Sequence, residues 1–69
     1  MNKYKCEVWL AVDKNGTECI YGAEPVRNKL AGEWLWNKND TSFMTVPKGT
    51  IEKILGRKIT WRNNAVKVE

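Results

Sequence analysis

The sequence predicts a small α+β protein, an antiparallel sheet of four to five short strands with one short helix near the C-terminus. Three observations lead to this class: apolar residues alternate near the N-terminus, Asn15-Gly16 marks a hairpin turn, and one helical apolar stripe follows Pro47. The 69 residues are expected to form a single domain, residues 1–69. A chain of this size buries only about 60% of its unfolded surface, so its four tryptophans should dominate a small core.

The first strand is predicted over residues 4–12, which alternate in the way a half-buried strand does. Asp13 can start a type I turn and Gly16 can supply a left-handed residue, which predicts a three-residue hairpin loop and a second strand over residues 17–21. That register pairs Trp9 with Tyr21. A two-residue Asn-Gly turn would shift the pairing by one residue, and the sequence leaves this alternative open.

Residues 22–32 have no clean period and contain Pro25 and Gly32, so we interpret them as a long surface connection. A third strand is predicted over residues 33–37, where Trp34 and Trp36 would share one face. A polar turn then leads to a fourth strand over residues 41–46.

One short helix is predicted after Pro47, which is suited to a first helical position. Its apolar stripe would consist of Ile51, Ile54 and Leu55, with Ile54 at the centre of the packed face, and Gly56 would end it.

Two short strands, 58–61 and 66–68, are expected around a turn at residues 62–65. The same order of elements would also suit a small SH3-like β-barrel, and closure of the sheet distinguishes the two folds.

Cys6 and Cys19 are predicted to be free thiols. The hairpin would place Cys19 opposite residue 11 or 12, roughly 17–20 Å along the strand from Cys6, whereas a disulfide needs Cα atoms within about 7 Å.

No catalytic centre is predicted, and we expect the protein not to be an enzyme. The sequence has no histidine, the commonest general base and metal ligand, and its eight carboxylates are scattered over strand faces and turns. Two separated cysteines cannot supply the four ligands of a structural zinc, and the five glycines form no phosphate-binding loop. We therefore expect no catalytic, cofactor-binding or metal-binding residues, and no cofactor.

Residues 10–18, LAVDKNGTE, and residues 46–61, VPKGTIEKILGRKITW, resemble segments of small uncharacterised proteins of phages, prophages and gut bacteria. The resemblance implies an origin in a mobile element and transfers no functional residue.

Charge is distributed unevenly along the chain. Residues 1–46 contain equal numbers of basic and acidic residues, so the C-terminal third carries the whole net charge of +4. The segment 57–62 interleaves basic residues with Trp61, a pattern that can hold single-stranded nucleic acid, although strand alternation favours a buried Trp61. The candidate binding residues are Lys53, Arg57, Lys58, Trp61, Arg62 and Lys67.

These observations favour a non-catalytic accessory protein that binds another protein, and the alternative is a small nucleic-acid-binding module that uses the basic C-terminal third. The partner would be an acidic protein surface or a nucleic acid. No apolar run is long enough for a signal peptide or a membrane span, so a cytoplasmic location without membrane contact is expected.

Overall fold

The computed structural model describes residues 7–38 and 42–69, and it confirms the predicted α+β class. The elements are β1 (Val8–Val12), β2 (Glu18–Tyr21), β3 (Val26–Asn28), β4 (Glu33–Leu35), β5 (Phe43–Val46), α1 (Thr50–Leu55) and β6 (Val66–Val68). Four strands form an antiparallel sheet in the order β5-β2-β1-β6, and β3 and β4 form a separate hairpin. Because β5 and β6 are edges of the sheet, the sheet does not close, and the barrel alternative is wrong.

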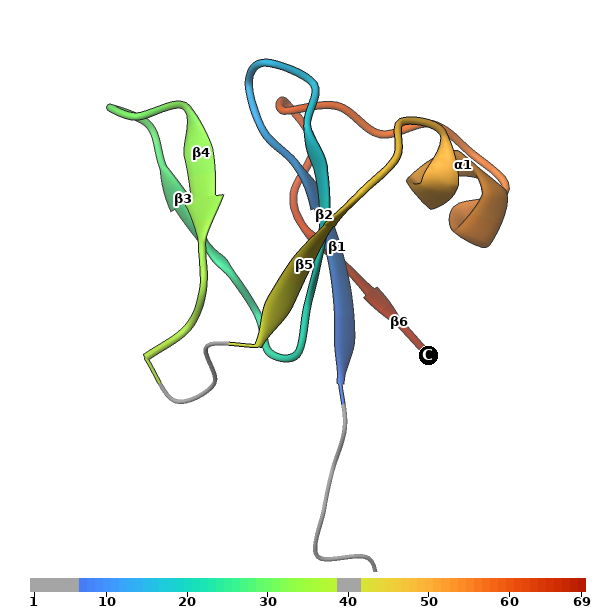
Figure 1. Ribbon diagram of the computed structural model, residues 1–69, viewed down its shortest axis with the longest axis horizontal. Helices are drawn as coiled ribbons and strands as arrows, with labels where there is room; N and C mark the ends of the chain where they lie inside the picture. Colours follow the sequence, from blue (N-terminus) through green and yellow to red (C-terminus); the bar gives the residue numbers. More distant parts are fainter. Residues whose placement is uncertain (1–6, 39–41) are drawn as a thin grey trace, which may run out of the picture.

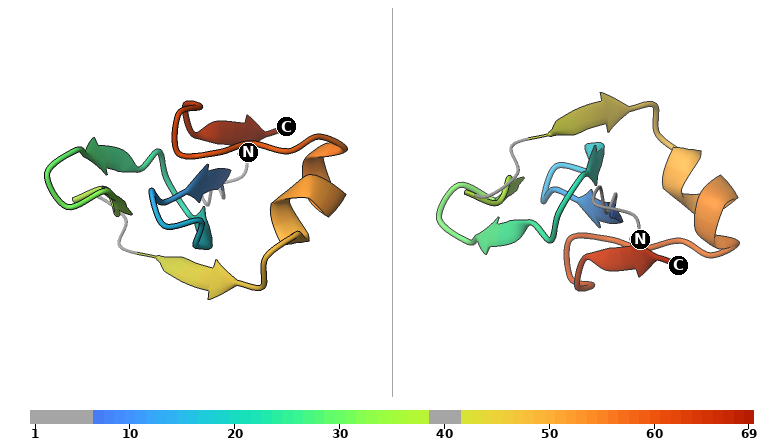
Figure 2. Two further views of the ribbon diagram at one scale, coloured as in Figure 1. Left: turned by 90° about the horizontal axis from the view of Figure 1, so that it is seen from above. Right: turned by 90° about the horizontal axis from the view of Figure 1, so that it is seen from below.

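The four-stranded sheet is covered on both faces. Figure 2 shows the β3–β4 hairpin on one side of the sheet and α1 on the other, and Figure 1 shows the same three layers from the front. Each face has its own apolar cluster. The helix side is built on Leu10, Val12, Ile51 and Ile59, and the hairpin side on Ala11, Cys19, Tyr21 and Trp34.

The hairpin turn between β1 and β2 has the predicted three-residue loop. The amide of Gly16 donates to the carbonyl of Asp13 at 2.9 Å. Gly16 has a φ of 92°, a left-handed backbone conformation that residues with a side chain rarely adopt. The register therefore pairs Trp9 with Tyr21 and Ala11 with Cys19. Cys19 is buried and free, while Cys6 lies outside the described residues.

The prediction that β1 is buried on one face only is wrong. Leu10 and Val12 face the helix side and Ala11 faces the hairpin side, yet all three are buried. The second face is covered because the β3–β4 hairpin packs Trp34 against Ala11 and its neighbours.

Residues 22–32 are not a structureless connection, because they contain β3. Arg27 pairs with Trp34 across the hairpin, and the side-chain oxygen of Asn28 accepts hydrogen bonds from the amides of Leu30 and Ala31, both at 3.1 Å. Gly32 completes the turn with a φ of 70°. A three-residue strand next to a side-chain-bonded turn gives no periodic signal, so the sequence pattern could not reveal it.

The two tryptophans of the third predicted strand differ in their environments. Trp34 is 9% exposed and lies in β4, whereas Trp36 follows the strand and is 48% exposed. The indole N–H of Trp34 donates to the carbonyl of Val12 at 3.0 Å, and its backbone amide donates to Oδ1 of Asp13 at 2.8 Å. These two bonds fix the hairpin to the end of β1.

The helix α1 begins at Thr50, three residues later than expected, after a turn in which the amide of Thr50 donates to the carbonyl of Pro47. Gly49 offers no side chain for capping, and the carboxylate of Glu18, from β2, takes this role. It accepts hydrogen bonds from the amides of Gly49 at 2.8 Å and Ile51 at 2.9 Å. Gly56 ends the helix as predicted, with a φ of 74°.

Ile54 is not the core residue of α1. It is 45% exposed, whereas Ile51 is 1% exposed and packs in the helix-side cluster. Because α1 has only six residues, it buries one apolar side chain, Ile51, against the sheet, and Ile54 lies at the edge of this contact.

The predicted strand over residues 58–61 is also wrong, because this segment forms no ladder. Its alternation is real, since Ile59 is buried and Lys58 and Thr60 are exposed, but the amide of Thr60 donates to the side chain of Asn63 instead of to a strand. The strand predicted over residues 66–68 is present as β6, and it pairs with β1. Within the described residues, no helix has the length and apolar character needed to cross a membrane.

Candidate functional site

The outer edge of β5 is the first candidate site. Among the strands of the described residues, β5 pairs with β2 and with no other. The amide of Gly22 donates to the carbonyl of Ser42, and pairs in an antiparallel ladder alternate between bonded and non-bonded. Met44 and Val46 therefore direct their backbone groups toward β2, and the N–H and C=O groups of Phe43 and Thr45 point away from β2, to the outer edge. The strand itself carries no charge.

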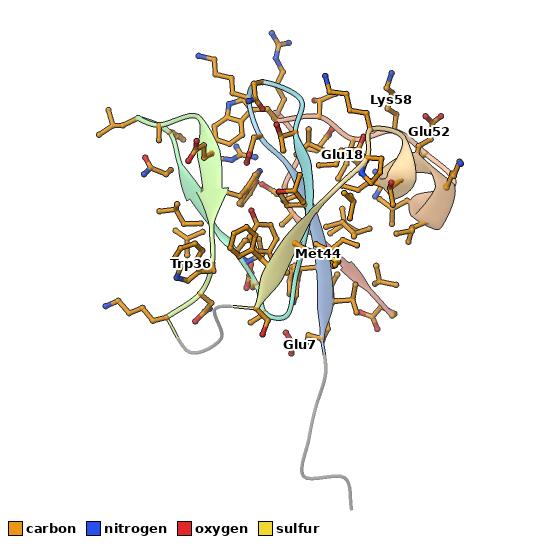
Figure 3. All side chains as sticks on the ribbon, viewed as in Figure 1. Glu7, Glu18, Trp36, Met44, Glu52 and Lys58 are labelled. Carbon is orange, nitrogen blue, oxygen red and sulfur yellow. The ribbon has the colours of Figure 1, made fainter. Side chains whose placement is uncertain are left out.

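Apolar side chains flank this edge on both faces of the sheet. On the hairpin side, the ring of Phe43 stacks on Tyr21 at 5.8 Å and on Trp36 at 5.2 Å between centroids. On the helix side, Met44 lies opposite Ile20 and is 58% exposed. Figure 3 shows Met44 on β5 and Trp36 below β4. We name Trp36, Phe43, Met44 and Thr45 the β5 edge surface.

The second candidate site is a groove of about 830 Å³ at the end of the sheet where α1 begins. It lies between the β1–β2 turn, the start of α1 and the segment 58–62, and we name it the basic groove. Its apolar lining consists of Val12, Ile51, Ile59 and Trp61, and its basic lining of Lys14, Lys48, Lys58 and Arg62. Figure 3 labels three residues of the lining at this end of the molecule, Glu18, Glu52 and Lys58.

Three acidic residues, Asp13, Glu18 and Glu52, also line the basic groove, and the first two accept hydrogen bonds from the backbone. Asp13 accepts the amide of Trp34, and Glu18 accepts two amides at the start of α1. Among the described residues, an ion pair joins Nζ of Lys67 to Oε2 of Glu7 at 3.7 Å, and neither residue lines the groove. The lining thus carries four cations and three carboxylates, and the carboxylates of Asp13 and Glu18 are directed at backbone amides.

The structure brings together only half of the predicted binding residues. Lys58, Trp61 and Arg62 line the basic groove, whereas Lys53, Arg57 and Lys67 do not. Lys14 and Lys48 belong to the groove and were not among the predicted residues. The pairing of Glu18 with Val46 brings the two lysines to one end, and only a prediction of the β2–β5 pairing could have found them.

Arg27 contacts both the ring and the backbone of Trp61, and the sequence did not identify Arg27 as a site residue. The guanidinium carbon of Arg27 lies 4.7 Å from the ring centre of Trp34 and 4.9 Å from that of Trp61. Its Nη2 donates to the carbonyls of Trp61 at 2.9 Å and Asn63 at 2.7 Å. This arrangement connects the β3–β4 hairpin to the segment that forms one wall of the groove.

Among the described residues, Tyr21 is the titratable group whose pKa clearly departs from its usual value. Burial raises the pKa of its hydroxyl, and nearby Cys19 and Asp13 raise it further. The hydroxyl donates to the carbonyl of Trp34 at 3.1 Å, a bond that needs the protonated form.

We expect stability to fall with pH above about pH 10, where tyrosine ionises in an unfolded chain. The folded state keeps the Tyr21 proton and the unfolded state loses it, so the stabilisation is present below that pH and is lost as pH rises toward the folded pKa. The contribution is at most about 1.4 kcal/mol per pH unit. Urea unfolding of the parent and Tyr21→Phe between neutral and alkaline pH measures it, and an identical slope in both proteins would contradict it.

Within residues 7–38 and 42–69, no three cysteine, aspartate or glutamate side chains are grouped so that they could hold a metal ion. The expected lack of a metal remains a prediction.

Comparisons with protein-family models, with curated proteins and with solved structures find no match to this chain.

Proposed function

We propose that this chain is a non-catalytic protein-binding domain that accepts an extended segment of its partner along the β5 edge. The observation that carries the proposal is a strand without a charged residue that, in the described part of the chain, forms the edge of the sheet. Its outward backbone groups are flanked by exposed apolar side chains on both faces. Sheet proteins usually protect such edges with lysine, proline or bulges. Strand addition uses an unprotected edge, with backbone bonds giving affinity and alternate side chains giving specificity.

The chemistry of the surface defines the partner segment. Alternate apolar side chains would contact Phe43 and Trp36 on one face and Met44 on the other. The net charge of +4, with Lys48 just beyond β5, favours an acidic partner because complementary charges speed association. The resemblance to phage and prophage proteins adds the proposal that the chain is an accessory protein of a mobile element.

Peptides selected from a displayed random library test this proposal. We expect selected peptides to carry alternating apolar residues and to shift the amide resonances of Phe43 and Thr45 in NMR spectra. Thr45→Pro should abolish binding, since it removes an outward-facing N–H while leaving the β2 ladder intact. Phe43→Ala should weaken binding about tenfold, the effect of losing about 1.4 kcal/mol of contact.

Leu30→Ala is the matched control. Leu30 is fully exposed in the turn between β3 and β4, so its removal deletes a comparable apolar side chain away from β5. Peptide affinity should be unchanged in this variant. Peptides that bind Thr45→Pro as tightly as the parent would show that the β5 edge is not the binding site.

A further inference from the structure

The basic groove has a lining that the β5 edge proposal does not use. Its cations come from three separate parts of the chain: Lys14 from the β1–β2 turn, Lys48 from the segment before α1, and Lys58 and Arg62 from the segment after it. A Cβ atom built on Gly16 would lie 3.5 Å from Nζ of Lys48, so the Lys48 side chain extends over the hairpin turn. The fold thus brings four cations around one opening, which also holds the carboxylates of Asp13, Glu18 and Glu52.

The lining of the groove also includes aliphatic side chains and one aromatic ring. Ile51 and Ile59 are buried, and half-buried Trp61 contributes to the same lining. Arg27 and the ring of Trp34, which forms a T-shaped pair with Trp61 at 6.0 Å between centroids, hold Trp61 in place without a ligand. A ring fixed in this way does not have to be ordered when a ligand arrives, which lowers the entropic cost of binding.

We propose that the basic groove binds a short stretch of single-stranded nucleic acid, with phosphates at Lys14, Lys48, Lys58 and Arg62 and a base against Trp61. A nucleic acid strand alternates anionic phosphates with flat, weakly polar bases, and this matches cations placed around an apolar lining with an aromatic ring. An uninterrupted run of acidic side chains would satisfy the cations but would bring only charged groups to Ile59 and Trp61. This activity uses none of the residues of the β5 edge surface, so either proposal can fail alone.

Fluorescence anisotropy with a labelled oligothymidylate of about twelve nucleotides tests the proposal, since this length covers a site of this kind. Four phosphate contacts give a slope of about −2.8 for the logarithm of affinity against that of salt concentration. Between about 50 mM and about 200 mM salt, affinity should therefore fall roughly 50-fold. A slope near zero would overturn the proposal.

Two charge reversals of equal size distinguish the groove from a general effect of net charge. Lys48→Glu with Lys58→Glu changes two groove cations, and Lys53→Glu with Arg57→Glu changes two exposed cations outside it. We expect the first pair to weaken binding at least 30-fold and the second at most about 3-fold. Equal losses in both would overturn the groove as the site. If the first pair lowers the melting temperature, Lys48→Ala with Lys58→Ala replaces it, with an expected loss of about 10-fold.

A peptide of twelve glutamates, of comparable charge, separates nucleic acid from acidic protein. Weaker binding of this peptide than of the oligothymidylate at equal salt supports the proposal. Equal or tighter binding of the peptide would overturn it and assign the groove to an acidic protein segment.

Discussion

Replacing Trp34 by alanine is expected to lower the free energy of unfolding by about 3–5 kcal/mol. The indole is buried between the sheet and the β3–β4 hairpin, its N–H donates to the carbonyl of Val12, and its face lies against Arg27. The whole domain should be stable by only about 3–10 kcal/mol, so the variant should be partly or fully unfolded at room temperature. Urea unfolding followed by circular dichroism measures the effect.

Trp36→Ala is the matched control, because it removes the same side chain from a half-exposed position. It loses a stacking contact with Phe43 and should cost about 1 kcal/mol. Trp34→Phe keeps most of the apolar volume and leaves the Val12 carbonyl without its donor, at a cost of about 1–3 kcal/mol. If Trp34→Ala and Trp36→Ala were equally stable, the hairpin would not pack on the sheet as described.

The second large effect is expected at Ile51, whose replacement by alanine should cost about 2–5 kcal/mol. Ile51 is the residue of α1 that is buried in the helix-side cluster, with Leu10, Val12 and Ile59. Removal of three methyl or methylene groups there leaves a cavity that a six-residue helix and a twisted sheet cannot easily close.

Ile54→Ala provides the comparison within the same helix. Its side chain is nearly half exposed, and the loss should be below about 1 kcal/mol. Thermal unfolding of the two variants under the same conditions decides between two orientations of α1. A larger loss for Ile54→Ala would mean that the helix is rotated so that Ile54 faces the sheet.

Local signals were enough to predict the elements that depend on neighbouring residues. Asp13 and Gly16 specify the turn because its conformation requires a left-handed residue at one position. The sequence left a two-residue loop open, and the three-residue loop seen in the structure fixes the β1–β2 register. Gly56 ends the helix for a similar local reason. These predictions needed no information about distant parts of the chain.

The candidate site was predicted only in part, for reasons that lie in long-range pairing. Lys58, Trp61 and Arg62 are close in sequence and remain together in the groove, whereas Lys14 and Lys48 join them only because β5 pairs with β2. The β5 edge surface depends on strand order as well, since a strand becomes an edge only when no other strand pairs with its outer side.

The sequence by itself determined the α+β class, the position of the first hairpin, the end of the helix and the excess of positive charge in the C-terminal third. The structure decided between the two registers that the sequence left open for that hairpin. Only the tertiary structure decided which faces are buried. Residues 26–28 form a strand because Arg27 and Trp34 pack against the sheet and Trp61, and this packing also buries the second face of β1. Alternation shows that a strand has two different faces, but the number of layers stacked on them depends on contacts between residues far apart in the chain.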